Sequence, residues 1–117
     1  ALRHEGNYQQ AISTYQETIK EWQRMGHRAA VAHQLECFAI IYKSLEQAEK
    51  ATKLLGSAEA LRQRIEIDMN PLEREEYERE VNDLKVNMDE KEFASLWTEG
   101  RTISMEEAIE FALDFSR

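Results

Sequence analysis

Apolar residues recur at every third or fourth position along almost the whole chain, which is the pattern of helices that bury one face. The first run predicts a helix over residues 7–25, which Gly26 is placed to end. Two further runs predict helices over 28–43 and 45–66, and Gly56 inside the latter would permit close packing. No stretch shows the strict alternation of a half-buried strand. The sequence therefore predicts an all-α chain.

The second half of the chain carries signals for three further helix starts. They are Asn70 with Pro71, Asp89 with Glu92, and Ser104 with Glu107. In the first, a capping residue precedes a Pro at the first helical position. The other two have capping-box spacing, in which a short side chain and a Glu three residues on satisfy free backbone N–H groups. We expect helices over 70–88, 89–99 and 104–116, the second stopping near Gly100.

The helices over 7–25 and 45–66 are related by a spacing of forty residues, which places Ala11 over Ala51. The positions that carry the repeat are Leu35, Phe38, Ala39 and Tyr42 on a first helix, Ala51, Leu55 and Ala58 on a second, and the link Gly6, Tyr8 and Ala11 before them. This pattern resembles the tetratricopeptide repeat (TPR) in the longer-spaced form of bacterial regulators. Glu46 and Ala48 depart from the Gly and Tyr of the family's link, and the Pro that usually closes a repeat is absent.

A second resemblance covers residues 51 to 115 and rests on the stretches LLGSAEALR and W-x-EGR-x-x-S-x-EEA. They look like C-terminal segments of large bacterial signalling proteins: LuxR-type and antibiotic-pathway transcription regulators, and cyclases and kinases with a predicted ATPase module. Together the resemblances imply antiparallel helical hairpins of a TPR-like right-handed superhelix over residues 1–66, with one repeat partial and one complete. They imply a C-terminal helical cap over 67–117, packed on the last repeat in one continuous domain. The chain is then expected to be a fragment of a longer protein.

The charge of the chain is concentrated in its second half. Residues 1–60 carry seven Lys/Arg and seven Asp/Glu, whereas residues 61–117 carry eight and sixteen, so the net charge of −8 lies there. Such a surface repels nucleic acid and anionic lipid, and we expect neither to bind directly. No apolar run is long enough to span a membrane. The single Cys37 excludes an internal disulfide, which favours a reducing, cytoplasmic location.

Candidate catalytic chemistry is sparse. His33 and Cys37 are spaced to reach one metal ion together, but no second Cys/His pair completes a tetrahedral site. The carboxylates of LEREEYEREVNDLK alternate with Arg at helical spacing, which favours a solvated, salt-bridged face over a catalytic pair. No Ser has the context of a nucleophile elbow, and the four Gly form no phosphate loop. We therefore expect no enzyme activity, no metal and no cofactor.

Binding is the function that the TPR resemblance implies, because stacked hairpins build a concave groove. The positions of this chain that correspond to the family's groove are His33, Glu36, Ile40 and Lys43. Charged groups around an apolar centre would recognise a ligand with polar and apolar parts. The alternative is that these side chains form a solvated face, since a terminal repeat is often a cap. Trp22 and Trp97 fall on apolar stripes, and we assign both to core packing.

Two functions follow from the sequence. The first is a non-catalytic protein-interaction or ligand-sensing module at the C-terminal end of a TPR-like region in a bacterial signalling or transcription regulator. Its partner would be a protein, a peptide or an upstream part of the same chain. The second is a homo-oligomerisation module that brings output domains together, in which residues 7–25 pair two copies. The apolar face for that pairing would be Tyr8, Tyr15, Ile19 and Trp22, expected to be partly uncovered.

The assigned repeat register places Ala39 where two helices cross closely. We expect Ala39→Leu to overpack that crossing and to lower the free energy of unfolding by about 1–3 kcal/mol. Thermal unfolding followed by circular dichroism measures the effect. A variant as stable as the parent would count against this register.

Overall fold

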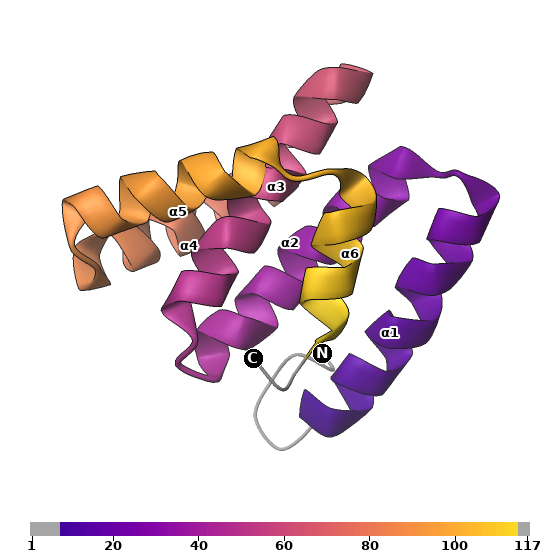
Figure 1. Ribbon diagram of the computed structural model, residues 1–117, viewed down its shortest axis with the longest axis horizontal. Helices are drawn as coiled ribbons and strands as arrows, with labels where there is room; N and C mark the ends of the chain where they lie inside the picture. The colour runs from indigo at the N-terminus through magenta and orange to yellow at the C-terminus, as the bar shows by residue number, and fades with distance from the viewer. Residues whose placement is uncertain (1–7, 115–117) are drawn as a thin grey trace.

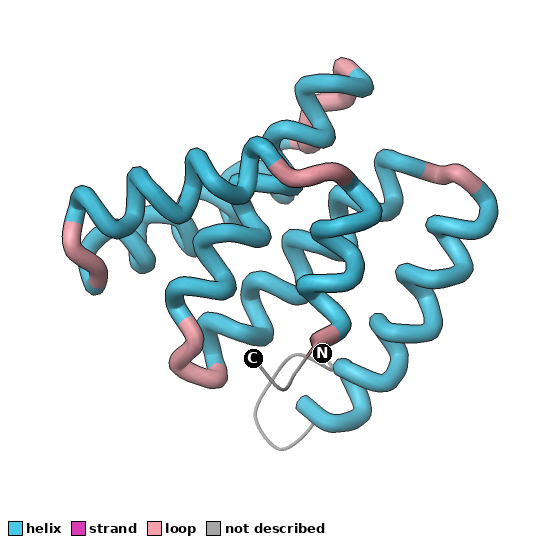
Figure 2. The backbone as a smooth tube through the Cα atoms, viewed as in Figure 1, coloured by secondary structure: helices cyan, strands magenta, loops and turns pink. Residues whose placement is uncertain are grey.

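The computed structural model describes residues 8–114, and every regular element in that part of the chain is an α-helix. The helices are α1 (Tyr8–Met25), α2 (Arg28–Ser44), α3 (Ala48–Ile65), α4 (Pro71–Asn87), α5 (Glu90–Thr102) and α6 (Met105–Leu113). Figure 2 shows that short connections join them. The prediction of an all-α chain is confirmed. Among the described residues, no helix has the length and apolar character needed to cross a membrane.

Three predicted helix boundaries differ from the structure. The third helix begins at Ala48 rather than at residue 45, because the intervening residues form a turn in which Glu46 has a φ of 63°. This left-handed backbone normally favours Gly, the residue that the TPR link has there. Gly100 does not end the fifth helix but lies inside α5, which continues to Thr102. The last helix ends at Leu113, earlier than predicted.

The predicted helix starts are anchored by side-chain caps. The Ser104 side chain accepts from the N–H of Glu107, and the Glu107 carboxylate accepts from the N–H of Ser104, which confirms that capping box. Asn70 caps α4 and forms a second box with Glu73. Asp89 accepts from the N–H groups of Lys91 and Glu92, at 3.1 and 3.2 Å. It therefore caps α5, but within residues 8–114 the Glu92 side chain does not complete the box.

The α2–α3 hairpin is the centre of the fold, and the other helices pack around it (Figure 1). Helix α1 lies against α2, α5 crosses α3, and α6 contacts both helices of the hairpin. The hairpin buries the residues of the TPR resemblance that lie on α2 and α3, whereas Gly6 and the side chains of Tyr8 and Ala11 lie outside the described residues. Each of the buried residues is at most 2% exposed: Leu35, Phe38, Ala39, Tyr42, Ala51, Leu55 and Ala58. A hairpin packed in this way is compatible with a helical repeat.

The apolar face of α1 is turned toward α2. Ile19 was expected to be partly uncovered but is fully buried. The ring centroids of Tyr15 and Phe38 are 6.0 Å apart, and those of Trp22 and His27 are 5.0 Å apart. Both α1 rings are half-buried against the core. The side chain of Tyr8 lies outside the described residues. Less apolar surface is therefore left on α1 for pairing than the sequence indicated.

The C-terminal end of α6 is fastened to the hairpin by two buried polar contacts. The Tyr42 hydroxyl donates to the carbonyl oxygen of Ala112 at 2.6 Å. Lys50, only 6% exposed, donates from its amine to the carbonyl oxygen of Asp114. The same amine lies 4.2 Å from the ring centroid of Tyr42. A cation at the end of a helix meets the negative end of its dipole, so these contacts stabilise the position of α6.

Helices α3 and α5 touch through their backbones at two glycines. A Cβ added to Gly56 would overlap the carbonyl oxygen of Trp97, and one added to Gly100 would overlap that of Lys53. Each glycine thus faces the other helix at the crossing, and only hydrogen atoms fit between the two backbones. The predicted role of Gly56 in close packing is confirmed. The role of Gly100 was misread because Gly near the end of an apolar pattern usually stops a helix.

This crossing makes a strong prediction about Gly100. Ala has a higher helix propensity than Gly by about 1 kcal/mol, so in an open helix the change would stabilise. Here we expect Gly100→Ala to push α5 off α3 and to lower the free energy of unfolding by about 2 kcal/mol or more. Urea denaturation measures it. Ser95→Ala, on the exposed side of the same helix, is the control and should stay within about 0.5 kcal/mol of the parent. A Gly100→Ala protein more stable than the parent would refute the close crossing.

Candidate functional site

The predicted groove residues lie on one side of α2, where α4 runs across them. Lys43 donates to Glu80 at 2.7 Å and to Asp83 at 2.8 Å, both on α4. Partial burial alone would lower the pKa of Lys43, but the hydrogen bonds to Asp83 and Glu80 outweigh that effect and raise it. The charge of Lys43 is therefore used to hold α4.

His33 is the second contact between the groove and α4. Its Nδ1 lies 3.3 Å from a carboxylate oxygen of Glu73 and 3.8 Å from one of Glu36. Its Nε2 lies 3.7 Å from the Sγ of Cys37. The contacts with Cys37 and then Glu36 raise the pKa of His33 to about 10, because they favour the ring that carries both protons.

Glu36 is turned inward and is already paired. It is 7% exposed, and its two carboxylate oxygens accept from Arg62 of α3 at 2.7 and 3.0 Å. Burial alone would lower the pKa of Arg62, but the contact with Glu36 raises it. A buried ion pair of this kind is costly to break from one side. Glu36 therefore ties α2 to α3 and does not present a free charge to the groove.

A small cavity of about 240 Å³ remains between α2 and α4. Three of the four predicted binding residues line it, namely His33, Glu36 and Ile40. Lys43 does not line it and is bound to the carboxylates of α4. The structure thus brings the four residues to one place, with α4 seated over them. Their role in binding a ligand stays a prediction.

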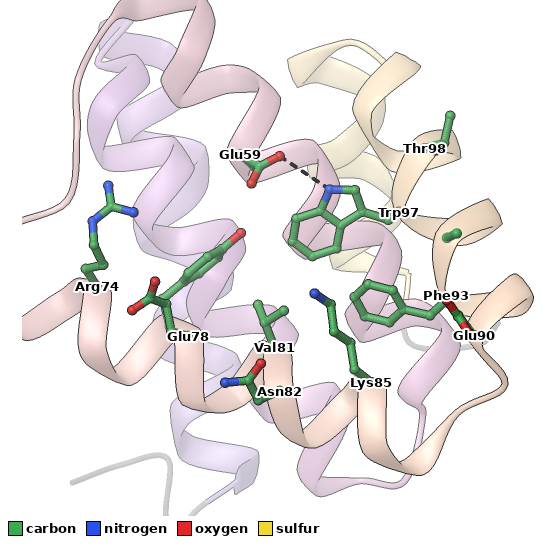
Figure 3. A pocket seen from close by; sticks show the side chains of 12 residues that line it. Glu59, Arg74, Glu78, Val81, Asn82, Lys85, Glu90, Phe93, Trp97 and Thr98 are labelled. Carbon is green, nitrogen blue, oxygen red and sulfur yellow. Dashed lines mark hydrogen bonds between the residues drawn. The ribbon is translucent and has the colours of Figure 1, made fainter.

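A larger cleft opens on the other side of α4, between α4 and α5 (Figure 3). Its volume is about 1030 Å³. Tyr77, Val81 and Lys85 of α4 form one wall, and Phe93, Ala94 and Trp97 of α5 form the other. Glu59 of α3 lies beside Trp97 at one end. The two helices that form its walls are joined by the short turn at Met88 and Asp89.

The base of the α5 wall forms an aromatic floor, in which Phe93 is 8% exposed and Trp97 is half-buried. The rings of Phe93 and Trp97 are stacked, with centroids 5.4 Å apart and planes 24° apart. The indole N–H of Trp97 donates to Glu59 at 3.3 Å, and Arg101 donates to the same carboxylate oxygen at 2.5 Å. These bonds fix the indole in place. Trp97 therefore packs against the core, as predicted, and also lines the cleft, which the sequence did not indicate.

Tyr77 stands between the two cavities and lines both. Its hydroxyl oxygen is buried and has no hydrogen-bond partner among the described residues. Burial, and then the nearby carboxylates of Glu59 and Glu36, raise the pKa of Tyr77, so the phenol stays protonated. A buried hydroxyl without a partner is unfavourable. The carboxylate of Glu59, which also contributes to the raised pKa, is a polar group near this hydroxyl.

The rim of the cleft carries acidic and basic side chains. Some of them form ion pairs with other parts of the chain, and others do not. Arg74 lies 3.8 Å from Asp68, and Glu59 is paired with Arg101. Neither Glu78 nor Glu90 forms a hydrogen bond or an ion pair through its side chain with any described residue. Both are exposed. The charges that the fold leaves without an ion pair to any described residue at this rim are therefore the carboxylates of Glu78 and Glu90 and the amine of Lys85.

Sequence reasoning missed this cleft, although part of its signal was visible. Phe93 and Trp97 are spaced i, i+4, as a stacked pair on one helix must be. Ala94 and Thr98, next to them, are small or polar and leave that side open. What could not be read from the sequence is the angle between α4 and α5.

Within residues 8–114, no three His, Cys, Asp or Glu side chains are arranged to hold a metal ion.

Comparisons of the chain with models of protein families, with curated proteins and with solved structures found no match. The function has to be inferred from the chemistry of the groove and the cleft.

The raised pKa of His33 predicts a pH-dependent stability. The folded-state pKa of about 10 exceeds the ordinary value of 6.5, so protonated His33 stabilises the fold fully below pH 6.5. That contribution is lost as the pH rises from 6.5 toward 10. We expect the parent to exceed His33→Gln in thermal midpoint at pH 6, and the gap to shrink steadily above pH 6.5. A gap that is constant with pH would show that the charge of His33 does not contribute to the stability of the fold.

Proposed function

We propose that the chain is a non-catalytic interaction module that binds a segment of a protein in the cleft between α4 and α5. The observation that carries this proposal is the stacked pair of Phe93 and Trp97 beside Val81 in an open cleft of about 1030 Å³. Helix-in-groove recognition needs an apolar floor flanked by polar walls. Aromatic side chains at the centre of such a floor supply most of the binding free energy.

The cleft is better suited to an external partner than the groove that the sequence indicated. In the groove, Lys43, His33 and Glu36 already have partners on α4 or α3. A ligand there would have to displace α4. In the cleft, the walls are exposed at Lys85, Ala94 and Thr98, and no element of the described chain covers them. Binding there requires no prior unfolding.

We place this module at the C-terminal end of a TPR-like region in a cytoplasmic bacterial signalling or transcription regulator. The support is the α2–α3 hairpin with α1 against it, together with the LLGSAEALR and W-x-EGR-x-x-S-x-EEA stretches. In this proposal residues 1–66 are the repeats of a right-handed superhelix and 67–117 are its cap. Helices α4, α5 and α6 all contact the hairpin, in keeping with that arrangement.

A second candidate is homo-oligomerisation through residues 7–25. Met25 is 61% exposed and lines a shallow hollow with Trp22 at the end of α1. This is a small apolar area, because Ile19 is turned inward. Sedimentation equilibrium of the chain and of Met25→Lys distinguishes the candidates: a dimer through α1 should dissociate in the variant.

The cleft is tested by blocking it with a neutral side chain. We expect Ala94→Tyr to weaken the binding of any amphipathic peptide by about tenfold or more, because the ring would fill the space over Phe93 and Trp97. Ser95→Tyr, one residue away on the exposed side of α5, is the matched control and should bind normally. Helical peptides of about 18 residues, one set rich in Lys and one in Glu, serve as probes in calorimetric titrations.

Two results would contradict the proposal. One is that no peptide of either charge shifts the indole N–H resonance of Trp97. That resonance is assigned as the one that is missing from the spectrum of Trp97→Phe. The other is that Ala94→Tyr and Ser95→Tyr bind equally well, which would place the site elsewhere.

A further inference from the structure

The charges around the cleft indicate what kind of segment would occupy it. This inference rests on the proposed function and specifies the partner. Of the two cations that line the cleft, Arg74 lies 3.8 Å from the exposed Asp68, and the amine of Lys85 lies 5.6 Å from the ring centroid of Phe93 without an ion-pair partner among the described residues. The carboxylates of Glu78 and Glu90 are not engaged by any described residue. Each wall therefore carries one carboxylate without a partner among the described residues, and two such carboxylates stand against the single unpaired amine of Lys85.

The aromatic floor already receives a cation. Lys85 places its amine within the range of a cation–π contact with Phe93, which stacks on Trp97. The amine of Lys85 thus occupies a position at which the rings could accept a cation from a partner. Lys85 is exposed and on the rim, so a cation from a partner could replace it without disturbing the core.

The surroundings of the cleft reinforce this preference. Residues 61–117, which supply nearly all of the cleft, hold sixteen Asp/Glu against eight Lys/Arg. The resulting negative potential attracts basic segments and repels acidic ones. It raises the association rate of a basic partner and helps to align that partner along the cleft. The negative potential and the aromatic floor therefore both favour a partner that carries Lys or Arg.

We infer that the cleft binds a basic amphipathic helix of a protein partner. Its apolar side chains would lie on Val81, Phe93 and Trp97. A Lys or Arg would contact the stacked rings in place of Lys85, and others would pair with Glu78 on one wall and Glu90 on the other. The opposed positions of these two carboxylates, one on α4 and one on α5, would fix the partner along the cleft.

The experiment compares three probes on the full chain by calorimetry and by the indole N–H resonance of Trp97. The first is a Leu/Lys amphipathic peptide of about 18 residues. The second has Glu at every Lys position, and the third is a lysine-only peptide of the same charge. We expect the first to bind and to shift the Trp97 resonance, and binding to weaken as salt is raised.

Charge reversal in the chain supplies the matched test. The double variant Glu78→Lys with Glu90→Lys should bind the Leu/Lys peptide about tenfold or more weakly than the parent does. It should bind the Leu/Glu peptide more tightly than the parent does. Glu17→Lys with Glu110→Lys changes the net charge equally at exposed positions outside the cleft. This control should stay within about twofold of the parent at physiological salt, since distant exposed charges are screened.

The outcomes separate the inference from the function on which it rests. If the Leu/Glu peptide binds as well as the Leu/Lys peptide and shifts Trp97, the basic partner is refuted while the cleft remains a binding site. If the lysine-only peptide binds equally, or if both double variants lose affinity equally, the attraction is non-specific and the inference fails. If no peptide shifts Trp97, the proposed function fails with it.

Discussion

The contact between the backbones of α3 and α5 at Gly56 and Gly100 determines the arrangement of the C-terminal half. Because neither position has a side chain, α5 lies directly on α3, and its direction is fixed by carbonyl groups rather than by adaptable side chains. A short turn then connects α5 back to α4. Helix α4, which ends at that turn, also lies across α2, so it diverges from α5. The cleft is a consequence of this geometry, since the flank of α5 with Phe93 and Trp97 faces a gap that α4 cannot close.

Helix α4 is held in its place more by charge than by apolar burial. Only Val81 and Leu84 of this helix are buried, whereas its carboxylates pair with Lys43 and approach His33. Exposed ion pairs contribute little each, about 0–1 kcal/mol, so α4 is attached less firmly than the hairpin beneath it. The stability of α4 should therefore respond to pH and to salt. It also forms one wall of the cleft, so conditions that loosen α4 should change the cleft before they unfold the core.

The sequence predicted the helices well because helical periodicity and caps are local signals. Residues such as Ser104 and Glu107 act on each other over one turn, and the structure confirms them. Gly100 was misread because the same residue type ends helices and permits close crossings, and only the position of α3 decides between the two. The groove residues were found together, but the sequence could not indicate that α4 covers them. That fact depends on contacts between positions about forty residues apart, such as Lys43 and Glu80.

The acidic character of α4 has two different outcomes on its two flanks. Glu73 and Glu80 are seven residues apart, two helical turns, and both face α2, where cations meet them. Glu78 lies on the other flank, above the cleft, where the aromatic floor offers no positive charge except Lys85. The pairing of one flank with the fold therefore leaves Glu78 on the other flank, with Glu90 opposite, as two carboxylates that face the cleft without a partner among the described residues.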